Sequence, residues 1–315
     1  MNRVLNAAAL LILGLISGVI IARIFPTQPR IAPAPIIQPP TGGPNAALLY
    51  WRYASIIPSA LARAAADERK AVENPSPNLT TLLVDHQDVV AGLIRAAAIE
   101  HCDFNLEYDS GIEHFQLSHV DIVRDAAGVL ALDARRLAAA GDTTGAVDRI
   151  EALLRMGAHM RSDRVLIASI LAGMVTATAC DEIDRLDLQN VNEPERARLL
   201  AAIAFMHDED PIGYKAALAG EKRVALSSDV FAGQGMRGLV LSGSARTISD
   251  IFDDAISVWD DEDALTKLDE IQKRAERDWT GVAGIAIPSF TGPKKAEQQI
   301  LDRLRRLESA LTSDN

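Results

Sequence analysis

Apolar residues recur at the three- and four-residue spacing of an α-helix along nearly the whole chain from Asn45 to its end. Alanine and leucine supply most of these positions, and aromatic residues make up only 4% of the chain. Alanine and leucine favour helices, whereas strands are enriched in aromatic and β-branched residues. The pattern therefore predicts an all-α fold in which residues 45–315 form one helical domain, long enough to bury a sizeable core.

Residues 4–25 are apolar apart from three polar side chains. A membrane span needs about 20 apolar residues, and its backbone satisfies its hydrogen bonds in lipid only as a helix. We therefore expect residues 1–25 to be an uncleaved signal anchor, a transmembrane helix whose residues 4–25 contact the lipid bilayer. A cleaved signal peptide is the alternative, but Pro35 directly follows the small residues that would form its cleavage site.

Residues 26–44 contain seven prolines and are expected to be an extended linker, which at about 3.1 Å per residue reaches up to about 60 Å. The arginines on the two sides of the apolar run nearly balance, so charge alone does not orient it. Because long domains translocate largely regardless of charge, we expect a single pass through the cytoplasmic membrane with the helical domain on the periplasmic, extracytoplasmic side.

The chain has a formal net charge of −11, and its first 44 residues hold three arginines and no acidic residue. The helical domain is therefore more acidic than the whole chain. Such a surface repels phosphate backbones, so we expect no nucleic acid partner.

The segment Leu130–Ala158 has the most specific local pattern, that of a tetratricopeptide-like helical hairpin. Its matching positions are Leu130, Ala134, Leu137, the turn Gly141-Asp142, Ala146, Ile150 and Leu153. Asp142 is expected to cap the second helix, while Asp133 occupies a position that is usually apolar. No second copy occurs at this period, so we expect an irregular helical domain rather than a solenoid.

The run Val165–Cys180 is apolar on all sides, but it is too short for a second span and is predicted to be a central core helix. Leu166, Ile170 and Met174 are expected to be buried in one core with the apolar residues of the hairpin. Cys180 suits such a core as a small buried residue. It and Cys102 also permit one disulfide in an oxidising compartment, and the spacing of the two cysteines leaves both possibilities open.

Local signals predict where several helices begin and end. We expect one helix over Asn78–Glu100, capping boxes at Ser118–Asp121 and Asn192–Glu195, and a helix from Asp210 to about Ala232. Gly233–Ser244 is predicted to be a loop because it holds four glycines.

The residues from Gly233 to Gly238 match G-x-G-x-x-G by letter, but this motif binds dinucleotides only between a strand and a helix. Helical patterns surround it here, and we expect no cofactor. After two further helical segments, the last helix is expected over Pro293–Leu311, with one apolar stripe.

Four short segments resemble one uncharacterised group of bacterial proteins. They are Asn45-Ala46-Ala47-Leu48-Leu49-Tyr50-Trp51, Cys102-Asp103-Phe104 with Gly111, the turn at Gly141-Asp142, and Gly220-Glu221-Lys222-Arg223. Members of that group are signal-anchored and all-helical, with a tetratricopeptide-like middle. The resemblance covers most of residues 45–311, and it implies a fold and a location but no activity or functional residues.

The densest set of potential metal ligands lies between residues 101 and 121. It comprises His101, Cys102, Glu113, His114 and His119, with Asp103 and Asp121 nearby. Zinc prefers a tetrahedral set of nitrogen and sulfur ligands, but His114 and His119 are about 140° apart around a helix, and no H-E-x-x-H motif is present. A polar loop that leads into a helix is therefore the favoured interpretation, with no catalytic residue and no bound metal assigned.

One further acid, Glu221, follows a glycine within an otherwise alanine-rich helical segment. If it is buried, it needs a cation such as Arg223 or a ligand, whereas an exposed helix face is the usual place for such a residue.

Taken together, these patterns predict a membrane-tethered helical protein that binds a protein or peptide, or serves as a scaffold, in the cell envelope. Stacked helical hairpins form concave surfaces suited to extended ligands. The alternative is an extracytoplasmic hydrolase that uses the histidines and acids of residues 101–121. Convergence of those groups in one cleft would favour the hydrolase.

Overall fold

The computed structural model describes residues 43–68, 75–108, 117–206, 210–227, 236–277 and 288–313, without the side chains of residues 236–244. The chain divides into two units, residues 1–36 and 37–315, and only the second contains described residues. Across the described ranges there are twelve α-helices and no strand, which confirms the all-α prediction. The expected anchor, residues 1–25, and nearly all of the linker, residues 26–44, lie outside the described residues.

The described helices cover most of these ranges. In chain order they are α2 (Ala46–Ala54), α3 (Ser59–Glu68), α4 (Pro77–Asp85), α5 (Gln87–Ala97), α6 (His119–Ala139), α7 (Thr143–Met160), α8 (Leu166–Arg185), α9 (Glu193–Ala204), α10 (Tyr214–Leu226), α11 (Met236–Ser257), α12 (Ala264–Glu276) and α14 (Thr291–Ser313). Two short 3-10 turns, η2 (Arg161–Asp163) and η3 (Leu188–Asn190), flank α8.

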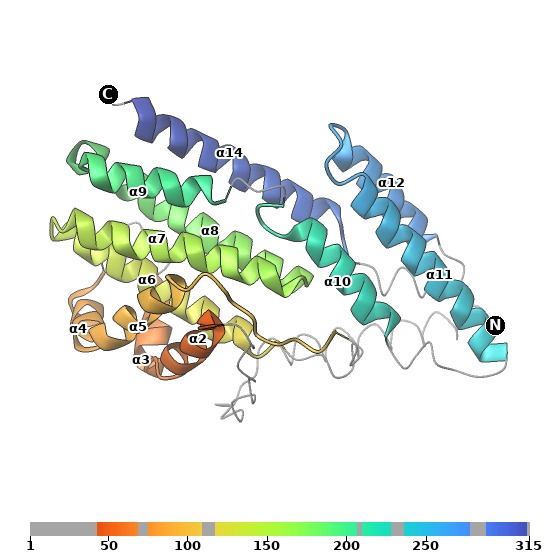
Figure 1. Cartoon of the computed structure of the whole chain (residues 1–315), viewed down its shortest axis with the longest axis horizontal. Helices are drawn as coiled ribbons and strands as arrows, with labels where there is room; N and C mark the ends of the chain where they lie inside the picture. The colour runs from red at the N-terminus through yellow and green to blue at the C-terminus, as the bar shows by residue number, and fades with distance from the viewer. Residues whose placement is uncertain are drawn as a thin grey trace. The chain divides into compact units, whose positions relative to one another are not determined.

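Helices α6 and α7 form the predicted hairpin, and α7 packs against both α6 and α8 (Figure 1). Gly141 adopts a positive φ of 79° in the turn, and Asp142 caps α7 by accepting a hydrogen bond from Gly145 N at 2.9 Å. The small residues Ala134 and Ala146 are both buried. Small side chains at these positions let the two helices approach closely.

Helix α8 is the central helix that the sequence predicts, in contact with α6, α7, α10 and α14. By length and composition it is the one described helix that could cross a membrane, but 61% of its apolar window is buried. Cys180 is fully buried on it, and both cysteines are free.

The expectation that Ile170 is buried on α8 was wrong: its side chain is 47% exposed, and Leu166 and Met174 are half-buried. The buried face holds Leu171 together with smaller residues, among them Ala168, Ala172, Val175, Thr176 and Ala179. Because α8 is apolar on every side, periodicity does not mark its inner face. Close helix packing selects that face instead, since a Cβ on Gly157 of α7 would lie 2.6 Å from Thr176 Oγ1.

Asp133 of α6 is fully buried although it carries a carboxyl group. Its carboxylate accepts hydrogen bonds from Arg136 and Arg149, each at 2.8 Å, and from Gln87 Nε2 at 3.1 Å. A buried carboxylate needs such partners because its desolvation is costly. Asp133 therefore joins α5, α6 and α7 at a position that is usually apolar.

Predicted element boundaries failed in four places. The segment Asn78–Glu100 forms two helices, α4 and α5, because His86 between them adopts a non-helical φ of −117° and ψ of 32°. The helix expected from Asp210 to about Ala232 begins only at Tyr214, and the Asp210 carboxylate accepts hydrogen bonds from Lys215 N and Ala216 N. Ser118 makes no capping hydrogen bond, and Asp121 instead pairs with Arg124. The expected loop Gly233–Ser244 is helical from its fourth residue onward, since each glycine costs a helix only about 1 kcal/mol.

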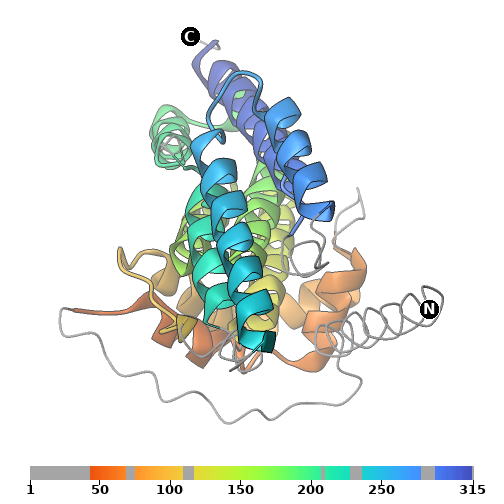
Figure 2. The ribbon, with the colours of Figure 1, turned by 90° about the vertical axis from the view of Figure 1, so that its right-hand side faces the viewer.

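Other local predictions were confirmed. Asn192 and Glu195 form both halves of a capping box. Helix α14 buries the predicted stripe, Ile300, Leu304, Leu307 and Leu311. Among the last four described helices, α10 lies beside α11, α11 packs against α12, and α12 contacts α14 (Figures 1 and 2).

Candidate functional site

Residues 101–108, which we call the strap, follow α5 without regular secondary structure up to Tyr108 and are held by the beginning of α2 (Figure 1). The strap turns at Asn105, which has a positive φ of 55° and donates its N–H to Asp103 Oδ1 at 2.7 Å. The side-chain amide of Asn45 donates to Asp103 O at 2.8 Å and accepts from Asp103 N at 3.0 Å. Ala46 N also donates to His101 O at 2.8 Å. The main chain of the strap is therefore bound at the point where the helical domain begins.

The other side of the strap is held by η2. Ser162 Oγ lies 2.6 Å from His159 O and 3.0 Å from Cys102 O, so its one hydrogen is shared between these two carbonyls, and the Tyr108 hydroxyl donates to Asp163 O. The contacts between the strap and η2 join segments that are more than 50 positions apart in the sequence. The strap thus links α2 to the turn that precedes α8.

The strap inserts one aromatic ring between two helices. Phe104, only 5% exposed, stacks on His119 of α6 with ring centroids 4.2 Å apart and planes 21° apart. The ring of Tyr50 from α2 is also nearly parallel to that of Phe104, with centroids 6.5 Å apart. Phe104 therefore packs with both rings, and we call Tyr50 and His119 the walls of an aromatic slot that Phe104 occupies.

His119 forms a buried pair with Asp163 of η2, with Nε2 and Oδ2 2.7 Å apart and exposures of 2% and 3%. Burial raises the pKa of the Asp163 carboxyl, and its hydrogen bond with His119 opposes that rise. Burial, together with the nearby Asp163 and Asp103, also raises the pKa of the Cys102 thiol well above its usual value. That thiol is therefore protonated at neutral pH and is a poor nucleophile.

The Tyr50 wall of the slot is fixed by a second buried histidine. The Tyr50 hydroxyl lies 2.9 Å from Nδ1 of His159. Burial lowers the pKa of His159 to about 4, while a hydrogen bond with the backbone of Ile99 acts in the other direction. His159 is therefore neutral at pH 7, and its ring can accept the hydrogen bond of the Tyr50 hydroxyl.

The structure places the predicted ligand residues in different environments. His101 is exposed, Cys102 is buried in the strap, and His119 is paired with Asp163. Glu113 and His114 lie outside the described residues. Within the described ranges no group of three or more histidine, cysteine, aspartate or glutamate side chains is placed to hold a metal ion.

Sequence reasoning missed Asp163, His159 and Ser162, all of which lie near the end of α7 or in η2. None of them belongs to a recognisable motif, and Asp163 follows its partner His119 by 44 positions. Tyr50 and Phe104, in contrast, lie within short segments that the sequence analysis singled out. No local signal in the sequence connects Asp163, His159 and Ser162 with Tyr50 and Phe104.

Glu221 lies on α10, where its Oε1 accepts a hydrogen bond from Leu166 N at 2.9 Å. Burial raises the pKa of its carboxyl, and this hydrogen bond lowers it. Arg223 lies over the ring of Tyr108, with its guanidinium carbon 5.7 Å from the ring centroid. The two residues therefore contact the first turn of α8 and the end of the strap, respectively.

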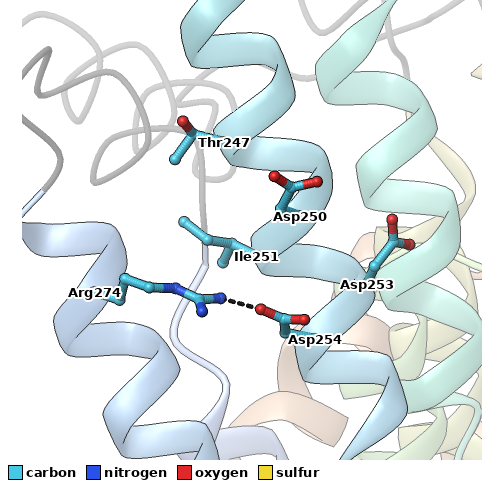
Figure 3. Close-up of a pocket in the computed structure, with 6 residues that line it drawn as sticks. All are labelled: Thr247, Asp250, Ile251, Asp253, Asp254 and Arg274. Atoms are coloured by element: carbon cyan, nitrogen blue, oxygen red, sulfur yellow. Dashed lines mark hydrogen bonds and ion pairs between the residues drawn. The ribbon is translucent and has the colours of Figure 1, made fainter.

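A separate hollow of about 450 Å³ lies between α11 and α12 (Figure 3). Its lining residues are Thr247, Asp250, Ile251, Asp253, Asp254 and Arg274. Arg274 pairs with Asp254, as Figure 3 shows, and Lys222 of α10 binds Asp253 at 2.7 Å. No motif in the sequence marks this acidic surface.

Comparisons with protein-family models, with curated protein sequences and with solved structures found no match to this chain.

Proposed function

We propose that this protein is a membrane-tethered helical module that binds a protein or peptide on the extracytoplasmic side of the cytoplasmic membrane. The apolar run at residues 4–25 and the proline-rich residues 26–44 support the tether. The α6–α7 hairpin, which we regard as tetratricopeptide-like, supports a binding role because such hairpins offer surfaces to extended ligands.

The observation that carries the binding role is the way the domain holds the strap. Side chains of Asn45 and Ser162 bind the main chain of a segment without regular secondary structure, and an aromatic slot takes its one phenylalanine. Main-chain hydrogen bonds with a side-chain pocket are the means by which proteins recognise extended peptides. The fold is therefore equipped for this mode of recognition.

A hydrolase built on residues 101–121 has weaker support. His119 and Asp163 have the spacing of a catalytic base and its orienting acid, but both are almost completely buried and Phe104 covers the imidazole ring. The thiol of Cys102 is kept protonated by burial. The polar groups of this region therefore serve chiefly to position one another.

The binding role can be tested by capture from membranes. Full-length protein would be cross-linked in intact cells, solubilised in detergent and purified, with a second anchored helical protein as the matched control. We expect a defined protein or peptide to be recovered with this chain and not with the control. Recovery of the chain alone, together with measurable esterase or peptidase activity, would favour the hydrolase.

A further inference from the structure

Several of the contacts that bind the strap do not depend on its side chains. The single amide of Asn45 satisfies both the N–H and the C=O of Asp103, while Ala46 N and Ser162 Oγ bind the carbonyls of His101 and Cys102. Three successive residues are therefore held through their main chain by groups outside the strap. Another peptide would find the same donors and acceptors there.

The slot for Phe104 has walls with their own supports. Tyr50 is held by His159 and His119 by the carboxylate of Asp163, so neither ring takes its hydrogen bond from the strap, although Tyr108 of the strap donates to the backbone carbonyl of Asp163. Two rings that lie nearly parallel to Phe104 favour an aromatic side chain at this position. Because Phe104 now occupies the slot, we expect the slot to accept an aromatic side chain of a ligand.

We propose that residues 101–108 occupy, within the same chain, a groove that binds a peptide with an aromatic side chain, and that such a peptide displaces the strap. This inference rests on the proposed binding function and specifies its ligand class. The strap then acts as an intramolecular competitor. Its displacement would leave the groove to the partner, whose aromatic residue would take the place of Phe104.

The two cysteines provide a built-in measurement of strap displacement. Cys102 belongs to the strap and is 6% exposed, whereas Cys180 is fully buried on α8. Release of the strap exposes the thiol of Cys102 but leaves that of Cys180 covered. Alkylation of Cys102 relative to Cys180, followed by mass mapping, therefore distinguishes strap release from general unfolding.

The probe is a synthetic copy of residues 101–108 with serine in place of its cysteine, added to full-length protein in detergent. We expect the alkylation rate of Cys102 to rise about fivefold or more and to saturate with peptide concentration, with no change at Cys180. A second peptide with alanine in place of phenylalanine should have little effect. Equal effects of both peptides, or no effect of either, would overturn the proposal.

A variant of the strap tests the competition directly. Phe104→Ala removes the internal competitor's anchor but leaves the slot, so the labelled phenylalanine peptide should bind about tenfold more tightly or better than to the wild type. Phe104→Leu is the milder variant, in case the alanine form does not fold, and should give a smaller change in the same direction. Phe290→Ala, at another fully buried phenylalanine, is the matched control and should leave peptide affinity unchanged. Equal affinity for wild type and both Phe104 variants would refute the competition.

Failure of this inference can be told apart from failure of the proposed function. If a partner is captured from membranes but neither peptide releases the strap, the protein binds elsewhere and the inference is wrong. If the phenylalanine peptide releases the strap while membranes yield no partner, the groove is real and the cellular binding role is wrong.

Discussion

Glu221 caps α8 from a different helix, because its Oε1 accepts the hydrogen bond of Leu166 N at 2.9 Å. The residue that precedes α8 is Val165, whose apolar side chain makes no capping hydrogen bond. The first turn of a helix leaves amide groups without intrahelical partners, and a carboxylate there is favoured by the helix dipole. Helix α10 therefore supplies the N-terminal cap of α8, which the residue just before a helix usually supplies.

This contact requires a glycine at position 220. A Cβ built on Gly220 would lie 1.7 Å from the carbonyl oxygen of Arg164, a residue with a positive φ of 46°. We predict that Gly220→Ala forces α10 away from α8 and lowers the free energy of unfolding by about 2–4 kcal/mol. Urea denaturation of full-length protein in detergent measures this. Gly292→Ala is the control, since no atom lies within 4 Å of the methyl group that it adds, and an unchanged midpoint for Gly220→Ala would contradict the steric argument.

Replacement of Glu221 separates its hydrogen bond from its charge. Glu221→Gln keeps an oxygen acceptor for Leu166 N, whereas Glu221→Ala leaves that amide without its partner and should cost about 1 kcal/mol. Because burial raises the pKa of the folded-state carboxyl above its unfolded value, the wild type should gain stability relative to Glu221→Gln as the pH falls through the raised pKa. Urea midpoints of the three proteins between pH 7 and pH 4 test this. The same pH dependence in the wild type and in Glu221→Gln would show that the charge is not penalised.

Protonation of His159 should destabilise the fold at acidic pH. Its pKa of about 4 in the folded state lies below the value of 6.5 expected when unfolded, so the unfolded chain takes up a proton between those two values. Stability should therefore fall as the pH is lowered from 6.5 to 4, by about 3 kcal/mol from this group. His159→Gln removes that part of the pH dependence, while Tyr50→Phe, which keeps the imidazole, retains it. Parallel pH profiles for wild type and His159→Gln would contradict the assignment.

The tether can be tested without knowledge of the partner. Residues 4–25 are long and apolar enough to remain in the bilayer, so full-length protein should fractionate with membranes and resist extraction by alkaline carbonate. Protease added to spheroplasts should digest residues 45–315. A mature protein that begins after residue 25 would show the anchor to be wrong, and protection of the helical domain from protease would show the orientation to be wrong.

Local features of the sequence determined the class of fold and several of its elements. The helical periodicity, the turn at Gly141-Asp142 and the capping box at Asn192 and Glu195 all act between residues at most a few positions apart. The stripe of α14 has one clear apolar side, so its buried face was also predicted correctly. Such interactions form within one helix or one turn, so they can be predicted from residues that are close together in the sequence.

Tertiary structure alone decided the candidate site. His119 meets Asp163 across 44 positions, Glu221 meets Leu166 across 55, and Asn45 meets Asp103 across 58. Packing also decided that Ile170 is exposed, because every side of α8 is apolar and only the close approach of α7 selects the inner face. Contacts of this kind depend on how whole helices are placed against one another, and no spacing within a single segment of the chain encodes them.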